Sequence, residues 1–141
     1  MKFIKWILII GVIAFIALQI IPYNRNHTNP PVVSEPNWDS PATREFAVRA
    51  CFDCHSNETV WPWYSNIAPV SWLVQQDVDG GRRRVNFSDW ANTREKGEIL
   101  EAVSGGYMPL SQYLLMHPEA KLTPEEKDAF LNGLRATLAQ N

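Results

Sequence analysis

An almost unbroken apolar run lies at the beginning of the chain. From Trp6 to Ile21 it is interrupted only by a glycine and by Gln19, and Lys2 and Lys5 precede it. A run without a polar face does not suit a surface helix of a globular domain, whereas about 20 helical residues match the hydrocarbon thickness of a bilayer. Residues 1–22 therefore predict a single N-terminal transmembrane helix, with the lysines retained in the cytoplasm.

A cleaved signal peptide is the alternative for the same segment. Such a signal has a shorter apolar region, of about 7–15 residues, followed by small residues at the cleavage site. Residues 19–23 read QIIPY and contain no such site. We therefore expect an uncleaved single-pass anchor in the cell membrane, with the rest of the chain facing the periplasm. A soluble periplasmic form is the alternative.

Residues 23–41 are polar and contain four prolines, with no helical or alternating pattern. This composition is typical of an extended linker that spans about 3.1 Å per residue. We therefore expect these residues to join the anchor to one domain at residues 42–141. His27 lies in the linker, where a solvated side chain is expected.

The pattern after residue 41 predicts an all-α domain, because apolar residues recur at helical spacing and no segment alternates like a strand. The expected helices cover residues 42–51, 68–78, 92–104, 110–116 and 124–139. Thr93 is the expected N-cap of the third of these helices. Thr123, followed by Pro124 and then Glu126, predicts a capping box at the start of the last helix. That helix carries a buried apolar stripe, which consists of Phe130, Leu131, Leu134 and Leu138.

Composition and charge restrict the class of protein. The chain has 141 residues, enough for one ordinary domain, and its formal net charge is −2. From residue 26 onward there are ten basic and fifteen acidic residues, a net charge of −5. An acidic domain argues against nucleic acid as a partner, since phosphates require a basic surface. It permits a cationic protein partner.

The only two cysteines of the chain lie in Cys51-Phe52-Asp53-Cys54-His55. This is the CxxCH pattern of covalent c-type haem attachment. Two thiols at this spacing on a turn can reach the two vinyl groups along one porphyrin edge, and the next imidazole can then ligate the iron. We predict one haem c, attached through Cys51 and Cys54, with His55 as its proximal ligand.

Three other uses of the two thiols are open at this point. A thioredoxin-like redox site has a strand before its cysteines, whereas residues 41–50 have the pattern of a helix. A disulfide across two intervening residues is strained or catalytic. A zinc site needs four ligands, which His55, His117 and acidic groups would have to complete. Covalent haem is favoured because it also agrees with export.

The sequence around the motif resembles a known family. Residues 51–90, CFDCHSNETVWPWYSNIAPVSWLVQQDVDGGRRRVNFSDW, with GGYMP at 105–109 and HPEAKLTPEE at 117–126, are similar to the bacterial haem-binding domain family. These are small exported proteins related in style to class I cytochromes c. The resemblance extends from about residue 42 to residue 138. It implies a cytochrome c-like helical domain wrapped on one covalent haem, with its first and last helices packed together.

The sixth position of the iron has four candidate ligands. Met108 is preceded by two glycines that end a helix and followed by Pro109, which favours an extended backbone at the methionine. We predict Met108 as the distal ligand, and the resemblance agrees, because class I cytochromes c use a Met-Pro dipeptide there. His117 is the second candidate, although it also suits the turn before the last helix. Met116 and His27 are expected to be packing and linker residues.

The sixth ligand separates two functions. Coordination by histidine and methionine suits single-electron transfer between redox partner proteins, with no catalytic residue in the chain. We therefore expect an electron carrier rather than an enzyme. An open or displaceable sixth position would instead suit a peroxidase-like enzyme or a gas sensor.

Aromatic and basic residues after the motif are further candidates for contact with haem. Four tryptophans have two interpretations: they contact the haem, on the porphyrin or at a propionate, or they are core aromatics with no role at the haem. They are Trp61, Trp63, Trp72 and Trp90. The basic run Arg82–Arg84 follows two glycines. It has three interpretations: a propionate partner, a docking patch for a redox protein, or a solvated helix end.

Overall fold

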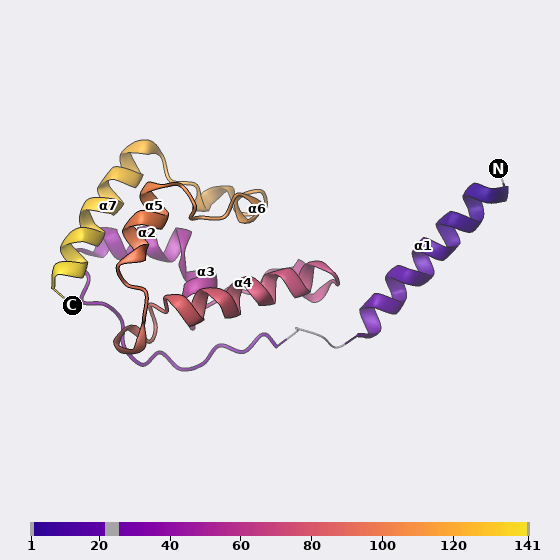
Figure 1. The fold of residues 1–141 in the computed structure, drawn as a ribbon, viewed down its shortest axis with the longest axis horizontal. Coiled ribbons are helices and arrows are strands. Elements are labelled where there is room, and N and C mark those ends of the chain that lie inside the picture. The colour runs from indigo at the N-terminus through magenta and orange to yellow at the C-terminus, as the bar shows by residue number, and fades with distance from the viewer. Residues whose placement is uncertain (1, 22–25, 141) are drawn as a thin grey trace. The chain divides into compact units, whose positions relative to one another are not determined.

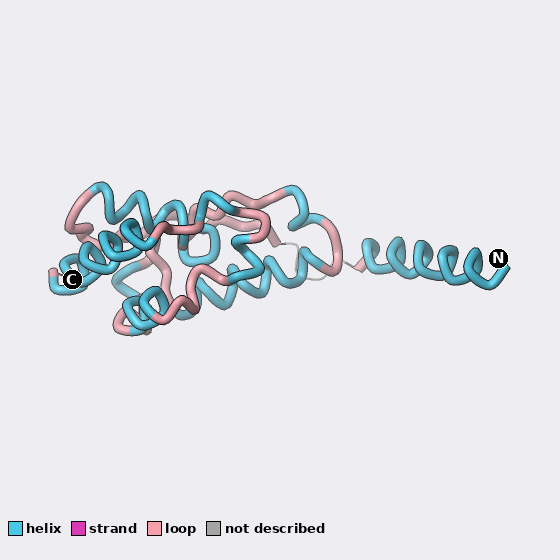
Figure 2. The backbone as a smooth tube through the Cα atoms, turned by 90° about the horizontal axis from the view of Figure 1, so that it is seen from above, coloured by secondary structure: helices cyan, strands magenta, loops and turns pink. Residues whose placement is uncertain are grey.

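The computed structural model describes residues 2–21 and 26–140, and its regular structure is helical (Figure 1). The α-helices are α1 (Lys2–Ile20), α2 (Pro41–Ala50), α3 (Phe52–His55), α4 (Val70–Arg84), α5 (Glu98–Ser104), α6 (Ser111–Leu114) and α7 (Pro124–Ala139). Short 3-10 helices are η1 (Trp63–Asn66), η2 (Trp90–Asn92) and η3 (Pro118–Ala120). Figure 2 shows helices and loops without a strand in the described part of the chain. The predicted all-α class is confirmed.

The chain divides into two compact units. One unit comprises residues 1–28 and 61–77, and it contains α1, η1 and the first half of α4. The other comprises residues 29–60 and 78–141, and it contains the CxxCH motif and the remaining helices. Each unit is described separately below.

In the first unit, α1 is the apolar helix that the sequence predicted. The stretch Phe3–Ile20 has a mean hydropathy of 2.4 and is long and apolar enough to cross a membrane. At about 1.5 Å per residue, its 18 residues extend about 27 Å, close to the thickness of a bilayer core. The helix could be a membrane span or a signal sequence, since both have this length and composition.

The predicted linker is not fully solvated, because several of its residues contact other residues of their own unit. In the first unit, the ring of His27 is half-buried and stacks on Trp61 with ring centroids 4.4 Å apart, so the expected solvated side chain was wrong. In the second unit, Val33 N–H donates to the Ser88 carbonyl at 2.8 Å, and Trp38 packs against the core cluster. Residues 23–25 lie outside the described residues.

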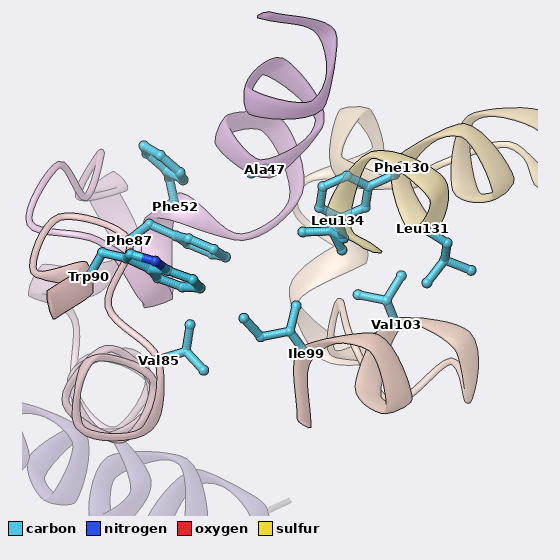
Figure 3. Packing of buried hydrophobic residues seen from close by; sticks show 10 residues of the cluster. All are labelled: Ala47, Phe52, Val85, Phe87, Trp90, Ile99, Val103, Phe130, Leu131 and Leu134. Atoms are coloured by element: carbon cyan, nitrogen blue, oxygen red, sulfur yellow. The ribbon is translucent and has the colours of Figure 1, made fainter. Parts of the chain in front are cut away.

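The core of the second unit lies between α2, α5 and α7. Phe46 of α2 meets Phe130 of α7 with ring centroids 5.9 Å apart. Phe130 and Val103 of α5 belong to the buried cluster that Figure 3 shows. Packing of the domain's first helix on its last helix agrees with the expected arrangement. The predicted capping box of α7 is confirmed, because Thr123 accepts from Glu126 N–H while the Glu126 carboxylate accepts from Thr123 N–H.

Two predicted helix boundaries were wrong. The helix expected to begin at residue 92 begins at Glu98, because Thr93 is not its N-cap. The Thr93 hydroxyl instead accepts from Asn86 N–H at 3.0 Å and donates to the Asn86 carbonyl at 2.9 Å. The helix expected to end at residue 78 continues as α4 to Arg84, through a pair of glycines.

Candidate functional site

The CxxCH motif consists of Cys51, which joins α2 to α3, and of the single turn of α3, and it separates its residues onto two faces. His55 N–H donates to the Cys51 carbonyl at 2.9 Å, as in a helix. On a helical turn, positions i, i+3 and i+4 lie on one side, so Cys51, Cys54 and His55 share a face. All three are half-buried, whereas Phe52 and Ser56 are buried. The motif therefore directs the Phe52 ring into the core and leaves both thiols and the imidazole half-buried, with Cys51 packed against the edge of the core cluster.

The imidazole of His55 is held in one tautomer. Its Nδ1 lies 3.1 Å from the Val85 carbonyl oxygen, and because a carbonyl only accepts, Nδ1 carries the proton. The lone pair is then on Nε2, which is the state required for an iron ligand. Burial lowers the pKa of His55 despite the opposing effect of the backbone carbonyls of Val85 and Gly81. The ring is therefore neutral at pH 7.

The thiols do not resemble those of a redox catalyst. Burial, with a smaller effect of Cys54, raises the pKa of the Cys51 thiol to about 12. Catalytic cysteines have a lowered pKa, because the thiolate is the nucleophile. The preceding element is the helix α2, not a strand. Among the described residues, no group of three or more histidine, cysteine and acidic side chains could hold a zinc ion.

The end of α4 packs directly behind the motif. A Cβ atom on Gly81 would overlap the carbonyl oxygen of Cys54, so only glycine permits this approach. The next residue, Arg82, donates through Nε to the Ser56 carbonyl at 2.7 Å. Arg82 also donates to Asn29 and Thr59. The sequence analysis interpreted only the arginines after this glycine pair, so the contact of Gly81 with Cys54 was not predicted.

A tyrosine that the sequence analysis did not select joins α6 to the motif. Tyr113 Oη donates to Oδ2 of Asp53 at 2.7 Å, and Val60 N–H donates to Oδ1 at 3.0 Å. Burial, followed by the bond to Asp53, raises the pKa of Tyr113, which keeps the hydroxyl a donor. Tyr113 also stacks on His117, with ring centroids 4.2 Å apart. Asp53 occupies a variable position of CxxCH, so the pattern gave no reason to single it out.

Met108 lies in the loop between α5 and α6, and its side chain is half-buried. Its N–H and that of Tyr107 both donate to the Ala102 carbonyl, at 3.1 and 3.0 Å. Gly106 has a φ of 74°, a left-handed conformation that favours glycine. The other candidates differ in their surroundings: Met116 is 54% exposed, and His117 is half-buried with Nδ1 at 3.1 Å from Glu119. Ligation by Met108 or by His117 stays a prediction.

Trp90 supplies a buried hydrogen-bond donor near the motif. Its ring stacks on Phe87 at 5.9 Å, and Phe87 stacks on Phe52 of α3 at 5.6 Å (Figure 3). Among the described residues, the buried Nε1 of Trp90 has no hydrogen-bond partner. An unsatisfied buried donor costs about 1–3 kcal/mol. A carboxylate such as a haem propionate would satisfy it, so the donor set around the motif fits haem.

Comparison with protein families gives a match that covers most of the chain. The profile of a family described as haem-binding domain matches residues 13–136. No match was found among curated proteins or solved structures. The matched range includes the CxxCH turn, the end of α4 and the methionine loop. The chain therefore belongs to the haem-binding domain family.

Proposed function

We propose that the protein is a membrane-anchored c-type cytochrome with one haem, which transfers single electrons in the periplasm. The observation that carries the proposal is the arrangement of the CxxCH turn in a chain of the haem-binding family. Cys51, Cys54 and His55 share a half-buried face, and the Val85 carbonyl holds the imidazole in the ligating tautomer. Bound haem supplies an iron that alternates between two oxidation states, which is the chemistry of an electron carrier.

Each residue of the site has a separate role in this proposal. Cys51 and Cys54 attach the cofactor through thioethers, so that it cannot dissociate. His55 ligates the iron through Nε2, while its Nδ1–H remains on Val85. Such a second hydrogen bond orients the ring and raises its basicity as a ligand. Trp90 donates to a propionate, which gives its buried Nε1 an acceptor.

The proposed location follows from the anchor. Lys2 and Lys5 lie in the N-terminal part of α1, and the positive-inside rule places basic residues on the cytoplasmic side. The domain after α1 then faces the periplasm. Its net charge of −5 from residue 26 onward suits cationic redox partners, because complementary charge accelerates encounter.

An enzyme or sensor with a displaceable sixth ligand is the second candidate. The observation that favours it is the local hydrogen bonding of the Met108 loop. The N–H groups of Tyr107 and Met108 both donate to one carbonyl, that of Ala102 in the preceding helix. The free energy needed to open such a local segment is smaller than the free energy needed to unfold the core. An open iron would bind carbon monoxide or react with peroxide, whereas tight ligation by Met108 would suppress both reactions.

Spectroscopy of the full-length holoprotein tests both parts of the proposal. Pyridine haemochrome analysis of the denatured chain should give the thioether-type spectrum, and extractable haem would overturn covalent attachment. The ferric wild type should have the far-red methionine-to-iron band, which Met108→Ala should lose. Met116→Ala is the matched control, because Met116 is exposed and its substitution should leave the band unchanged. A band that persists in Met108→Ala would exclude Met108 as the ligand.

A further inference from the structure

An uncharged aromatic segment lies in the first unit, outside the proposed haem ligands. Residues 61–76 contain no Asp, Glu, Lys or Arg, in a chain in which 20% of residues are charged. Several of its large apolar side chains are exposed: Trp63 by 70%, Leu73 by 47% and Val70 by 43%. Val70 and Leu73 are three positions apart on α4, so they lie on the same face of that helix. We call these three residues the aromatic surface.

The aromatic segment is attached to the C-terminal end of α1. Gln19 Nε2 donates to the Ala68 carbonyl at 2.9 Å, and Ala68 N–H donates back to Gln19 Oε1 at 3.0 Å. Gln19 is the polar residue near the end of an otherwise apolar helix. The reciprocal pair therefore fixes the turn before α4 to the last turn of the apolar helix.

The exposure of α1 agrees with a contact at this end alone. The described side chains from Phe3 to Ala17 are all exposed, whereas Leu18 and Gln19 are half-buried. The chain beyond the helix also stays with the segment. His27 stacks on Trp61, and its Nε2 lies 3.1 Å from the Ser65 carbonyl.

The length of α1 sets the depth of this contact in a membrane. If Phe3–Ile20 spans the hydrocarbon core, Gln19 lies within one turn of the boundary between acyl chains and headgroups. The turn paired with Gln19 then lies at the same depth. Trp and Tyr are enriched at that depth because their rings combine an apolar body with a polar group. The segment contains no charged residue. Charged side chains are disfavoured at the headgroup boundary, although less strongly than in the hydrocarbon core.

We propose that the aromatic surface, Trp63, Val70 and Leu73, docks into the headgroup region of the outer leaflet of the bilayer that α1 spans. The inference rests on the anchor in the proposed function, and it does not depend on the ligands of the iron. Its occupant is lipid, because the surface is uncharged and apolar, includes an exposed tryptophan, and belongs to the segment that the Gln19–Ala68 pair fixes to the end of the membrane helix. The docked segment restricts the motion of the chain beyond α1 at the membrane surface.

Photocrosslinking in lipid vesicles tests the proposal with the full-length holoprotein. The photoreactive residue p-benzoylphenylalanine replaces Trp63 or Leu73, and the protein is reconstituted in phosphatidylethanolamine and phosphatidylglycerol. Both sites are exposed, so the substitution preserves folding, which the haem absorption verifies. Val12 in α1 is the positive control, and the exposed, charged Arg135 of α7 is the negative control.

A lipid-mass adduct at positions 63 and 73 and its absence at position 135 are expected. Leu73→Glu should strongly reduce the adduct at position 63, because a carboxylate opposes insertion. An adduct at position 12 without adducts at 63 and 73 would overturn the docking surface and leave the anchor intact. Loss of the adduct at position 12 would overturn the anchor itself. Crosslinking of 63 or 73 to a second copy of the chain would overturn lipid as the occupant.

Discussion

The motif turn, residues 51–56, and the methionine loop, residues 105–110, are held in different ways. The motif turn is fixed by distant parts of the chain, since the Val85 carbonyl holds the His55 ring and Tyr113 donates to Asp53. The N–H groups at the start of the methionine loop donate only to carbonyls of the preceding α5, as far as the described residues show. Tertiary contacts therefore position the motif turn on one side of the proposed iron site. Local backbone hydrogen bonds position the methionine loop on the other side.

This difference has a consequence for ligand exchange. A residue held by tertiary contacts moves only when the domain opens, whereas a loop held by its own helix can open locally. His55 is then expected to stay bound through any change that displaces Met108. The two regions are joined by α6, which follows the loop and carries the hydroxyl bonded to Asp53. The predictions below test how independent the two regions are.

The largest effect is expected from Gly81→Ala, which breaks the support of the motif turn. Its Cβ would overlap the Cys54 carbonyl, and separating α4 from the turn should cost about 3 kcal/mol, within the upper range for overpacking. We expect a lower yield of attached haem and a lower denaturant midpoint. Gly80→Ala is the matched control, because its Cβ would have only Arg83 Nη2 nearby, at 3.9 Å. Equal haem yield in the two variants would contradict the close contact.

Tyr113→Phe should have the second largest effect, because it removes the link between the two regions. Asp53 Oδ2 loses its donor, which costs about 1–3 kcal/mol for a partly buried carboxylate. We expect a lower unfolding midpoint and faster binding of carbon monoxide, since α6 no longer restrains the methionine loop. Tyr107→Phe, in the loop but 69% exposed, should change neither measurement. Unchanged carbon monoxide kinetics in Tyr113→Phe would show that the two regions are independent.

The sequence predicted those parts of the site that depend on neighbouring residues. Cys51, Cys54 and His55 form one helical turn, so their common face follows from spacing, and the cap at Thr123 is likewise local. Gly81 and Tyr113 contact the motif from 27 and 60 positions away, and no local pattern indicates which helix will meet it. They became visible only in the packed structure.

The wrong helix start has the same physical origin. Thr93 has the side chain of an N-cap, and residues 92–104 have helical periodicity. Its hydroxyl is instead used by the backbone of Asn86, seven positions earlier, so the helix begins only at Glu98. A competing tertiary hydrogen bond overrides a weak local preference, because each cap contributes only about 1 kcal/mol.

Trp90→Phe is expected to have a smaller effect, confined to the side of the motif turn. The ring stack with Phe87 remains, but the proposed donor to a propionate is lost. A carboxylate that loses a hydrogen bond to its charged form has a higher pKa. The pH dependence of the reduction potential should therefore move to higher pH. Trp63→Phe, at an exposed ring, should leave it unchanged, and an unchanged profile in Trp90→Phe would exclude Trp90 as the donor.

The smallest effect is expected from Glu35→Gln, which removes a partly exposed ion pair beside the motif turn, where Arg44 lies over the Phe52 ring. Glu35 Oε2 lies 2.7 Å from Arg44 Nε at the start of α2, and the hydrogen bond from Arg44 holds the pKa of Glu35 below its usual 4.5, against the opposing effect of burial. Its stabilisation is present above pH 4.5 and is lost as the pH falls through the lowered pKa. Because the pair is partly exposed, it contributes at most about 1 kcal/mol.

Denaturant unfolding of wild type and Glu35→Gln should therefore differ at pH 7 and converge near pH 3. Glu45→Gln, at an exposed position of α2, is the control, and it should match the wild type at both pH values. A difference between wild type and Glu35→Gln that persists at low pH would show that the side chain stabilises α2 by packing instead of by charge.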